Sequence, residues 1–580
     1  MAFNQVQHVL VKLPAWRRRV LLVAILLGFL ALMMRGVYLQ GTHKKDVLQK
    51  EGEARYSREI ILSAQRGKIL DRNGDLLAGS SQVESIWASP PDVVITSEQM
   101  TQLAKMLTLK PKDIEKKLAN TQKEFVYLKR RQSPELAANV MRLGVSGIFT
   151  QREYKRYYPA AEISAHIVGF TGADDKGLEG FEREKNDFLS GKTGKRRVLK
   201  DRRGRIIEDL EAVGLPQDGQ DLVLSIDQRI QYLAYRELNK SVEKFKAKAG
   251  AAVVLDAKTG EVLAMVNLPT YNPNNPVNIN GKARNRAITD VFEPGSTMKP
   301  ITISAALNVG AINTTDKFQT APGAMAIGSA VIHDAHVHGV LDVAGVIQKS
   351  SNIGSAKIAL KLENAYLWGI FNELGFGAPT RIEFPGEVSG KLRNYKTWRP
   401  IEKATMSYGH GISVTLLQLA RAYTVFANEG ELRPVTLLKT NKAMVGHPVF
   451  SPDTANQMKD MLELVVQPGG TALRAQVPGY RVAGKTGTTH KLGPAGYEKD
   501  KYVGSFVGLA PASNPRLIMA VMIDEPTSGE YYGGTVAAPV FSAVMTDALR
   551  MLAVPQDAPD NNVVIPADAN ETLVEVEESI

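Results

Sequence analysis

The sequence predicts an α+β protein with three parts. These are a single N-terminal transmembrane helix, an elongated mixed α/β pedestal domain, and a larger domain with an antiparallel sheet flanked by helices and a helical subdomain. Three observations support this class. One apolar run near the N-terminus is long enough to cross a bilayer. A hairpin signal follows between residues 60 and 77. From about residue 226, hairpin, helix and strand patterns succeed one another, and the last strands gather near the C-terminus.

Five segments are predicted from these patterns. They are a cytoplasmic tail (1–19), a transmembrane signal anchor (20–40), the pedestal, which is of a dimerisation type (41–225), the larger domain (226–555) and a disordered acidic tail (556–580). The composition is ordinary for globular protein, with 44% apolar and 23% charged residues. The net charge of +11 suits an anionic polymer or anionic lipid, and no zinc-finger or RNA-binding signature points to nucleic acid. The chain has no cysteine, which excludes disulfides and thiol catalysis and fits an extracytoplasmic location.

The membrane segment begins with the apolar run 20–34. Arg35 interrupts this run, and residues 36–39 extend it to spanning length. Lys12 and the three arginines 17–19 precede it, so the positive-inside rule places the N-terminus in the cytoplasm and the chain after Leu39 outside. A cleaved signal peptide is the alternative, but no small-x-small cleavage site follows closely. The pattern favours an uncleaved, single-pass signal anchor, with Arg35 near its outer end.

The pedestal shows structural signals but no catalytic group. Residues 41–58 are polar and predicted to be helical as they leave the bilayer. Residues 66–77 form a strand, an Asn73-Gly74 turn and a second strand. Residues 98–143 have helical periodicity and many lysines. Because no nucleophile stands beside a base in this part, we interpret it as a non-catalytic interaction domain.

The larger domain begins with a predicted helix from Asp227 to Leu238, followed by a hairpin over residues 251–266 around a Lys258-Thr259-Gly260 turn. Residues 341–362 are mostly helical but interrupted at 349–352. Other predicted helices are at 416–428, 455–465 and 538–551, and strands at 481–483, 502–508 and 517–523. The helix before residue 240 and the one at 538–551 are expected to pack on one face of the sheet.

The stretch 291–300 carries the candidate nucleophile. Pro294-Gly295 break the preceding segment, and residues 301–307 continue in helical rhythm. Ser296 and Lys299 are three apart and share a helix face, so a neutral Lys299 can take the proton of the Ser296 hydroxyl. An N-capping serine with a solvated lysine is the alternative. A second Ser-x-x-Lys, Ser241 to Lys244, lies in a polar helix and is interpreted as surface.

Ser350-Ser351-Asn352 and Lys485-Thr486-Gly487-Thr488 follow Ser296 in that order. Ser350 can relay a proton between Lys299 and a leaving or attacking amine. Asn352 can hydrogen-bond a substrate amide or hold Lys299.

The second of these motifs supplies binding groups. Lys485 supplies positive charge that attracts a substrate carboxylate and helps to keep Lys299 neutral. Thr486 and Thr488 offer hydroxyls to the same carboxylate, and Gly487 lets an extended peptide lie close to the strand. The backbone N–H groups of Ser296 and Thr488 would form an oxyanion hole. Two other Lys-Thr-Gly copies, at 192 and 258, precede Ser296 and are interpreted as a loop and a hairpin turn.

This ordered motif set resembles that of the penicillin-binding proteins. Nearly the whole chain is similar to the class B members, above all the division-specific transpeptidases of Gram-negative bacteria. Motifs of both domains carry the resemblance: 66–74, 156–159, 177–182, 284–300, 348–354, 408–411 and 531–534. The resemblance implies a D,D-transpeptidase that cross-links septal peptidoglycan through an acyl-serine, releases D-Ala, needs no cofactor and is inhibited covalently by β-lactams. It also implies an FtsW-type glycosyltransferase and other divisome proteins as partners.

Parts of the sequence also fit other functions and sites. Ser351 stands where class A β-lactamases have aspartate, and no Glu-x-x-x-Asn motif follows, which argues against an efficient lactamase. The chain has no glycosyltransferase domain. An elongation-specific enzyme has the same chemistry, and a non-catalytic β-lactam sensor is a rival of another class. His333, His336 and His338 resemble a metal cluster, but outward-facing histidines are the preferred interpretation, and His410 is assigned a structural role.

Overall fold

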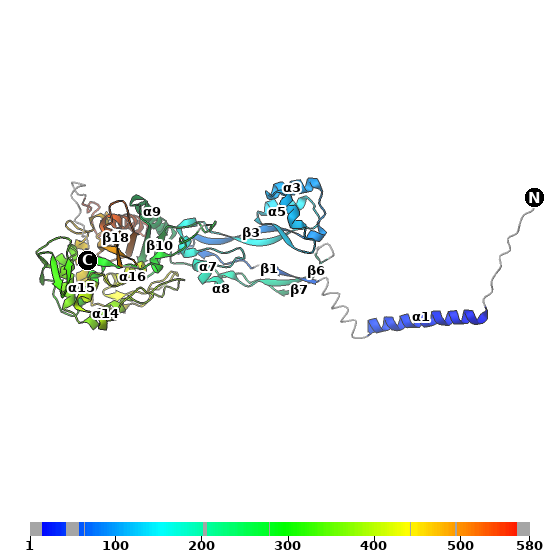
Figure 1. The fold of residues 1–580 in the computed structure, drawn as a ribbon, viewed down its shortest axis with the longest axis horizontal. Helices are drawn as coiled ribbons and strands as arrows, with labels where there is room; N and C mark the ends of the chain where they lie inside the picture. The colour runs from blue at the N-terminus through cyan, green and yellow to red at the C-terminus, as the bar shows by residue number, and fades with distance from the viewer. Residues whose placement is uncertain are drawn as a thin grey trace, which may run out of the picture. The chain divides into compact units, whose positions relative to one another are not determined.

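The computed structural model describes residues 14–41, 57–62, 64–200, 206–277, 279–440, 442–493 and 496–564 (Figure 1). The predictions for the start of the cytoplasmic tail, for residues 42–56 and for the acidic tail beyond 564 lie outside the described residues, whereas Ser57 and Arg58, predicted to be helical, belong to strand β1 (Ser57–Leu62). Helix α1 (Ala15–Gly41) contains the predicted membrane segment, and its residues Ala15–Leu39 are long and apolar enough to cross a bilayer. The Arg35 guanidinium lies 5.8 Å from the centroid of the Tyr38 ring.

The chain divides into two compact units, and the smaller contains residues 83–153 and 192–217. One of its sheets is antiparallel, in the order β1 (Ser57–Leu62), β6 (Gly194–Lys200) and β7 (Ile206–Gly214). Its hydrophobic core lies under the helices α3 (Ser97–Leu107), α4 (Pro111–Leu118) and α5 (Pro134–Arg142), beside β4 (Val126–Gln132) and parts of β3 (Leu76–Ala88) and β5 (Ile148–Tyr157). Thr96 and Gln99 form a capping box at the start of α3, which explains why the helix begins there.

The larger unit begins with residues 65–82, which include β2 (Ile69–Leu70) and the predicted Asn-Gly turn, and it continues with residues 154–191. These segments hold a buried ion-pair cluster. The Nε atoms of Arg66 and Arg156 each lie 2.6 Å from one oxygen of Glu182. Buried charges need partners. One carboxylate shared by two guanidinium groups therefore holds together the backbone around residues 66, 156 and 182. These three residues come from three of the sequence motifs noted above.

The central sheet of this unit is antiparallel, in the order β10-β9-β19-β18-β17. The strands are β9 (Ala249–Asp256), β10 (Val262–Leu268), β17 (Ala483–Gly493), β18 (Gly496–Ala510) and β19 (Leu517–Asp524). All side chains of β9, β10 and β19 are buried, as expected for strands covered on both faces. The hairpin predicted around Lys258-Thr259-Gly260 joins β9 to β10. The α+β prediction is confirmed.

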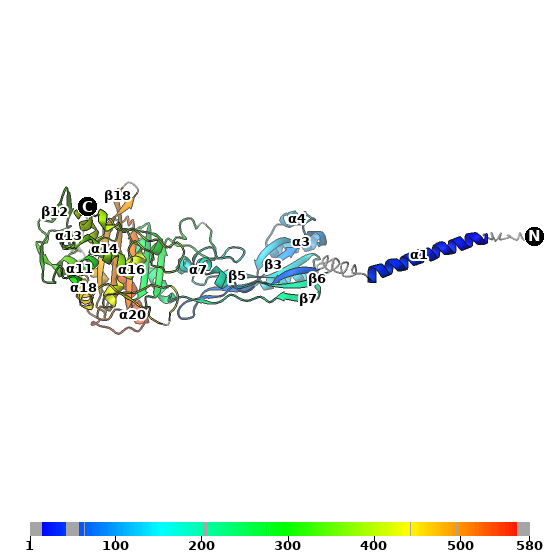
Figure 2. The same cartoon turned by 90° about the horizontal axis from the view of Figure 1, so that it is seen from below.

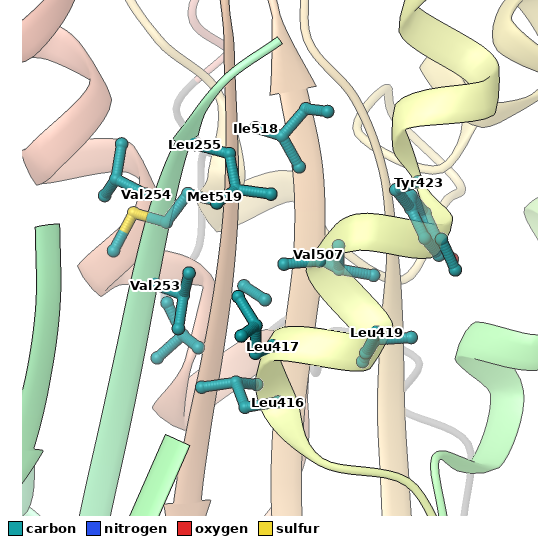
Figure 3. Close-up of a cluster of buried hydrophobic side chains, with 14 of the residues drawn as sticks. Val253, Val254, Leu255, Leu416, Leu417, Leu419, Tyr423, Val507, Ile518 and Met519 are labelled. Atoms are coloured by element: carbon teal, nitrogen blue, oxygen red, sulfur yellow. The ribbon is translucent and has the colours of Figure 1, made fainter. Parts of the chain in front are cut away.

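Helices cover this sheet. Helix α9 (Gln228–Lys244), which Asp227 caps, and α20 (Ala538–Met551) pack against each other and against the strands, as predicted. Helix α16 (Leu416–Ala422) packs against β9 and β19. Figure 3 shows its Leu416, Leu417 and Leu419 among strand side chains such as Val253, Val507 and Met519.

The helical subdomain consists of α11 (Lys299–Asn308), α12 (Val343–Gln348), α13 (Asn352–Leu360), α14 (Asn364–Glu373), α15 (Pro400–Ser407) and α18 (Pro452–Leu464). Figure 2 shows α11, α13, α14 and α18 together beside the sheet. Helix α11 contacts α13, α14 and α18, so the helix that follows Ser296 lies inside this group. The predicted interruption at 349–352 is the connection between α12 and α13.

Two sequence predictions are wrong in detail. Ser241 is buried, and its hydroxyl donates to the Val536 carbonyl at 2.7 Å, whereas Lys244 is exposed as predicted. Packing of α9 against the segment before α20 was not visible in a polar helical pattern. The tail is not disordered from Gln556: residues up to Val564 contact the segment 476–481. Asp557 accepts a hydrogen bond from the Arg481 N–H at 2.7 Å, and the Asn562 amide donates to the Tyr480 carbonyl at 2.9 Å.

His166 gives this unit a pH-dependent stability. It is buried, and its Nε2 lies 2.7 Å from the Lys282 carbonyl oxygen. Burial lowers the pKa of His166 from 6.5 to about 4. The unfolded state therefore binds more protons between these values, and the free energy of unfolding falls as the pH drops through 6.5.

Replacing His166 by glutamine is expected to remove this dependence. From pH 6.5 to pH 5 the histidine contributes a loss of about 2 kcal/mol in the free energy of unfolding, which the H166Q protein lacks. Urea midpoints at pH 7 and pH 5 measure the difference. H447Q, which makes the same change at an exposed histidine, is measured beside it as the control. An H166Q protein with the full wild-type dependence contradicts the assignment.

Candidate active site

The candidate nucleophile lies at the entry to α11. Gly295 has a φ of +58°, and a 3-10 turn, η3 (Gly295–Met298), leads into the helix. The backbone approaches the turn 408–411 so closely that a Cβ on Gly409 would lie 2.2 Å from the Gly295 carbonyl oxygen. Ser296 is 3% exposed and Lys299 is fully buried. The prediction of a serine on the first turn of a helix is therefore correct, except that this first turn is a 3-10 turn.

The three predicted motifs meet around Ser296. Lys299 Nζ lies 2.5 Å from Ser296 Oγ, 2.6 Å from the Ser350 carbonyl oxygen and 3.1 Å from Ser350 Oγ. Ser350 Oγ lies 2.9 Å from Ser296 Oγ and 2.8 Å from Lys485 Nζ. Ser350 thus links the serine to both lysines. Such contacts let a proton pass between the serine hydroxyl, the lysine amine and a relay hydroxyl.

Ser350 is held between α12 and α13 with a φ of +58°, an uncommon conformation for a non-glycine residue. The next residue, Ser351, caps α13: its Oγ accepts from the Gly354 N–H at 2.9 Å and donates to Asp334 Oδ2 at 2.6 Å. Asp334 Oδ1 also accepts from the Ile353 N–H at 2.9 Å. Asp334 was missed in the sequence, because its only signal was an acidic residue beside the histidines.

The side-chain amide of Asn352 has one atom with a hydrogen-bond partner and one without a partner among the described residues. Its amide nitrogen donates to the His333 carbonyl at 3.0 Å, whereas its buried Oδ1 has no hydrogen-bond partner among the described residues. No hydrogen bond therefore joins this oxygen to Lys299, which was one of the two suggested roles. A buried acceptor without a partner is costly, and a substrate N–H would satisfy it.

Strand β17 brings in Lys485, Thr486, Gly487 and Thr488 at one edge of the sheet. Thr486 Oγ1 lies 2.8 Å from Thr471 Oγ1, and Thr488 Oγ1 accepts from the Gly533 N–H at 3.1 Å. Lys485 is fully buried. An edge strand has unpaired backbone groups, so an extended peptide can add to it.

Gly487 has no room for a side chain. A Cβ there would lie 2.5 Å from Ser505 Oγ and 2.8 Å from the Pro294 carbonyl oxygen. Because Pro294 belongs to the loop before Ser296, relief of the clash would move the nucleophile. Gly487→Ala is therefore expected to destabilise the protein by about 1–3 kcal/mol and to slow acylation by penicillin. Gly369→Ala in α14 is the control, since no atom lies within 4 Å of the added Cβ. Thermal melts and labelling rates measure both effects, and a G487A protein that matches G369A contradicts this account.

The sequence raised a metal site at His333, His336 and His338 and a structural role for His410. The rings of His336 and His338 lie 6.2 Å apart. The pKa of His338 is lowered, and burial is the largest cause. In the part of the chain that the structure describes, no group of three His, Asp or Glu side chains is placed to hold a metal ion. His410 Nδ1 lies 3.3 Å from Glu293 Oε2, close to the loop that carries Ser296.

Comparison with known families gives two matches. Residues 61–224 match the penicillin-binding protein dimerisation domain, and residues 250–546 match the penicillin-binding protein transpeptidase domain. The transpeptidase domain of penicillin-binding protein 3 from Burkholderia pseudomallei is 51% identical in sequence, with a TM-score of 0.54, and covers 58% of this chain and 98% of that one. A peptidoglycan synthetase from Bifidobacterium adolescentis is 25% identical, with a TM-score of 0.70, and covers 88% of this chain and 99% of its own.

Two relatives match along almost their full length. The probable peptidoglycan D,D-transpeptidase PenA of Neisseria gonorrhoeae is 42% identical over 543 residues, which are 93% of each chain. The peptidoglycan D,D-transpeptidase FtsI of Escherichia coli is 40% identical over 567 residues, 97% of this chain and 95% of that one. The resemblance predicted from the motifs is confirmed. The chain belongs to the penicillin-binding protein family, as a member with a dimerisation domain followed by a transpeptidase domain.

Proposed function

We propose that the protein is a serine-type D-Ala-D-Ala transpeptidase that cross-links the stem peptides of peptidoglycan, with Ser296 as its nucleophile. The observation that carries the proposal is the 2.5 Å contact between Lys299 Nζ and Ser296 Oγ, within a cluster that also contains Ser350 and Lys485. The names of the PenA and FtsI relatives support the same activity.

In the first half-reaction, Ser296 Oγ attacks the carbonyl carbon of the penultimate D-Ala while Lys299 accepts the hydroxyl proton. The amide C–N bond then breaks. The terminal D-Ala leaves with a proton relayed through Ser350, and an acyl ester stays on Ser296. In the second half-reaction, the side-chain amine of a diamino acid on another stem attacks this ester. A new amide forms, the amine gives its proton to the relay, and the Ser296 hydroxyl is restored.

Each of the other residues has a binding role in this proposal. Lys485 and the hydroxyls of Thr486 and Thr488 attract the terminal carboxylate of the donor stem. Asn352 Oδ1 accepts a hydrogen bond from a substrate amide. The backbone N–H groups of Ser296 and Thr488 receive the developing oxyanion, and Gly487 lets the extended stem lie along the edge of β17.

A β-lactam presents a strained amide in the position of the donor and acylates Ser296. The leaving amine stays attached to the acyl group, and no Glu-x-x-x-Asn motif follows Asn352 in the sequence to deacylate it efficiently. The drug therefore stays bound as an ester. Covalent inhibition follows from the same nucleophile that performs the cross-linking.

The proposed location is the inner membrane, with α1 as a single anchor, the N-terminus in the cytoplasm and both folded domains in the periplasm. We propose a pedestal over 41–225 and a transpeptidase domain over 226–555, with the packed segment up to 564; within the pedestal, residues 65–82, 154–191 and 218–225 belong to the same compact unit as the central sheet. The proposed setting is septal synthesis with an FtsW-type glycosyltransferase and other divisome proteins. The full-length similarity to a relative named FtsI supports this choice. Depletion that makes cells filament supports the division role, whereas rounding indicates the elongation-specific alternative.

The activity is tested on the purified full-length protein in detergent, with a D-Ala-D-Ala stem pentapeptide as donor and a diamino-acid stem as acceptor. Release of D-Ala together with a cross-linked dimer, both blocked by penicillin, is the expected result. Penicillin labelling without D-Ala release or cross-linking would instead identify a β-lactam sensor.

A further inference from the structure

Glu293 is a buried carboxylate, three residues before Ser296, with no part in the reaction described above. It is 7% exposed. Its Oε1 accepts from the Gly411 N–H at 2.7 Å, and its Oε2 accepts from the Tyr497 hydroxyl at 2.9 Å. His410 Nδ1 lies 3.3 Å from the same Oε2. A carboxylate buried this deeply needs such partners, and hydrogen bonds to a charged acceptor are stronger than neutral ones.

These partners belong to two segments far apart in the sequence. Gly411 and His410 lie in the turn 408–411, and Tyr497 lies in β18. The backbone of Glu293 is also held, because Thr489 Oγ1 in β17 donates to its carbonyl oxygen at 3.2 Å. Glu293 therefore contacts both strands of the β17–β18 hairpin as well as the turn.

Both segments carry groups of the active site. Strand β17 contains Lys485 and Thr488, the proposed carboxylate anchor and the second donor of the oxyanion hole. The turn begins at Tyr408, whose ring centroid lies 5.9 Å from Lys299 Nζ, and the Gly409 carbonyl accepts from the Gly295 N–H at 3.4 Å. The position of the loop 293–296 relative to these two segments thus affects how far Ser296 lies from Lys485 and Thr488 in β17.

We infer that Glu293 is a positioning residue for acylation, which joins the loop of the nucleophile to the β17–β18 hairpin and to the turn 408–411. This inference rests on the proposed function, because it concerns the alignment of Ser296 with Lys299 and Thr488. Tyr497 is 39% exposed; its hydroxyl donates to Glu293, and its ring centroid lies 6.3 Å from that of His410. The contribution is made before substrate arrives, so it affects the rate of acylation more than the affinity for the ligand.

The test uses Glu293→Gln, Tyr497→Phe and the double variant. Stopped-flow acylation with a fluorescent penicillin separates the dissociation constant of the initial complex from the acylation rate constant. Each single change is expected to lower the acylation rate constant by about tenfold, as for one lost hydrogen bond to a charged group, with the dissociation constant changed less than about twofold. Because both changes weaken the same Glu293–Tyr497 contact, the effects of the two single changes are expected to combine less than multiplicatively in the double variant.

Tyr480→Phe is the matched control, since the Tyr480 hydroxyl donates to the Val554 carbonyl at 2.7 Å, in the segment after α20. It is expected to keep the wild-type acylation rate. The inference is overturned if Y497F acylates at the wild-type rate, if the two single effects multiply in the double variant, or if Y480F slows acylation equally. Failure of the wild-type protein to react with penicillin would instead overturn the proposed function, so the two failures are distinguishable.

Discussion

Replacing Ser296 by alanine is expected to abolish covalent labelling by fluorescent penicillin while the protein stays folded. The acyl bond forms to Ser296 Oγ, the atom 2.5 Å from Lys299 Nζ and 2.9 Å from Ser350 Oγ. Alanine removes this atom alone and leaves Pro294, Gly295 and the start of α11 in place. Gel fluorescence after incubation with the labelled penicillin measures the reaction, and a thermal melt measures the fold. The signal of S296A falls to background.

The chain supplies a control for this experiment in its other Ser-x-x-Lys. Ser241 is also buried and hydrogen-bonded, but to the Val536 carbonyl rather than to a lysine. Ser241→Ala is expected to keep full labelling while it loses about 1–3 kcal/mol of stability, because the Val536 acceptor is left without its donor. Persistent labelling of S296A would show that another residue is the nucleophile and would overturn the assignment.

Replacing Lys299 by methionine is expected to lower the rate of acylation by about 10²–10⁴-fold, the range for loss of a general base. Lys299 is fully buried, and methionine has a similar length and apolar stem, so the volume of the site is nearly retained. The amine that touches both Ser296 Oγ and Ser350 Oγ is lost. Time courses with a fluorescent penicillin at saturating concentration measure the rate constant, and slow residual labelling of Ser296 is expected.

The exposed Lys244 provides the comparison, because Lys244→Met makes the same chemical change in the second Ser-x-x-Lys. Its acylation rate is expected to equal that of the wild type. If K299M acylates within a few fold of the wild type, Lys299 is not the base, and Lys485, through Ser350, becomes the next candidate to test.

Local patterns predicted much of the fold. Turn residues and apolar periodicity located the β9–β10 hairpin, α9 and the break between α12 and α13, because these features depend on residues close in sequence. The burial of Ser241 and the packing of residues 556–564 were not predictable in this way. Both depend on contacts with segments that the local pattern does not reveal, at Val536 and at 476–481.

The residues of the candidate site also divide into those that local motifs reveal and those that only long-range contacts reveal. Ser296, Lys299, Ser350 and Lys485 were found because each lies in a motif whose residue types match a reaction. Asp334 and Glu293 were not predicted as site residues, because a single carboxylate indicates no role until the groups that donate hydrogen bonds to it are known. Asp334 is recognisable only when Ser351 and Ile353 are seen to donate to it. Residues that hold a site in place are thus harder to find from sequence than residues that react.

The order of strands in the central sheet has a consequence for biosynthesis. Strand β9 pairs on one side with β10, its immediate neighbour in the chain, but on the other side with β19, which ends at Asp524. Strand β17, with Lys485, joins the sheet only through β18. During synthesis the ribosome therefore delivers Ser296 long before the strands that complete its surroundings. The nascent β9–β10 hairpin has an open edge throughout this interval, which favours mispairing unless a chaperone shields it.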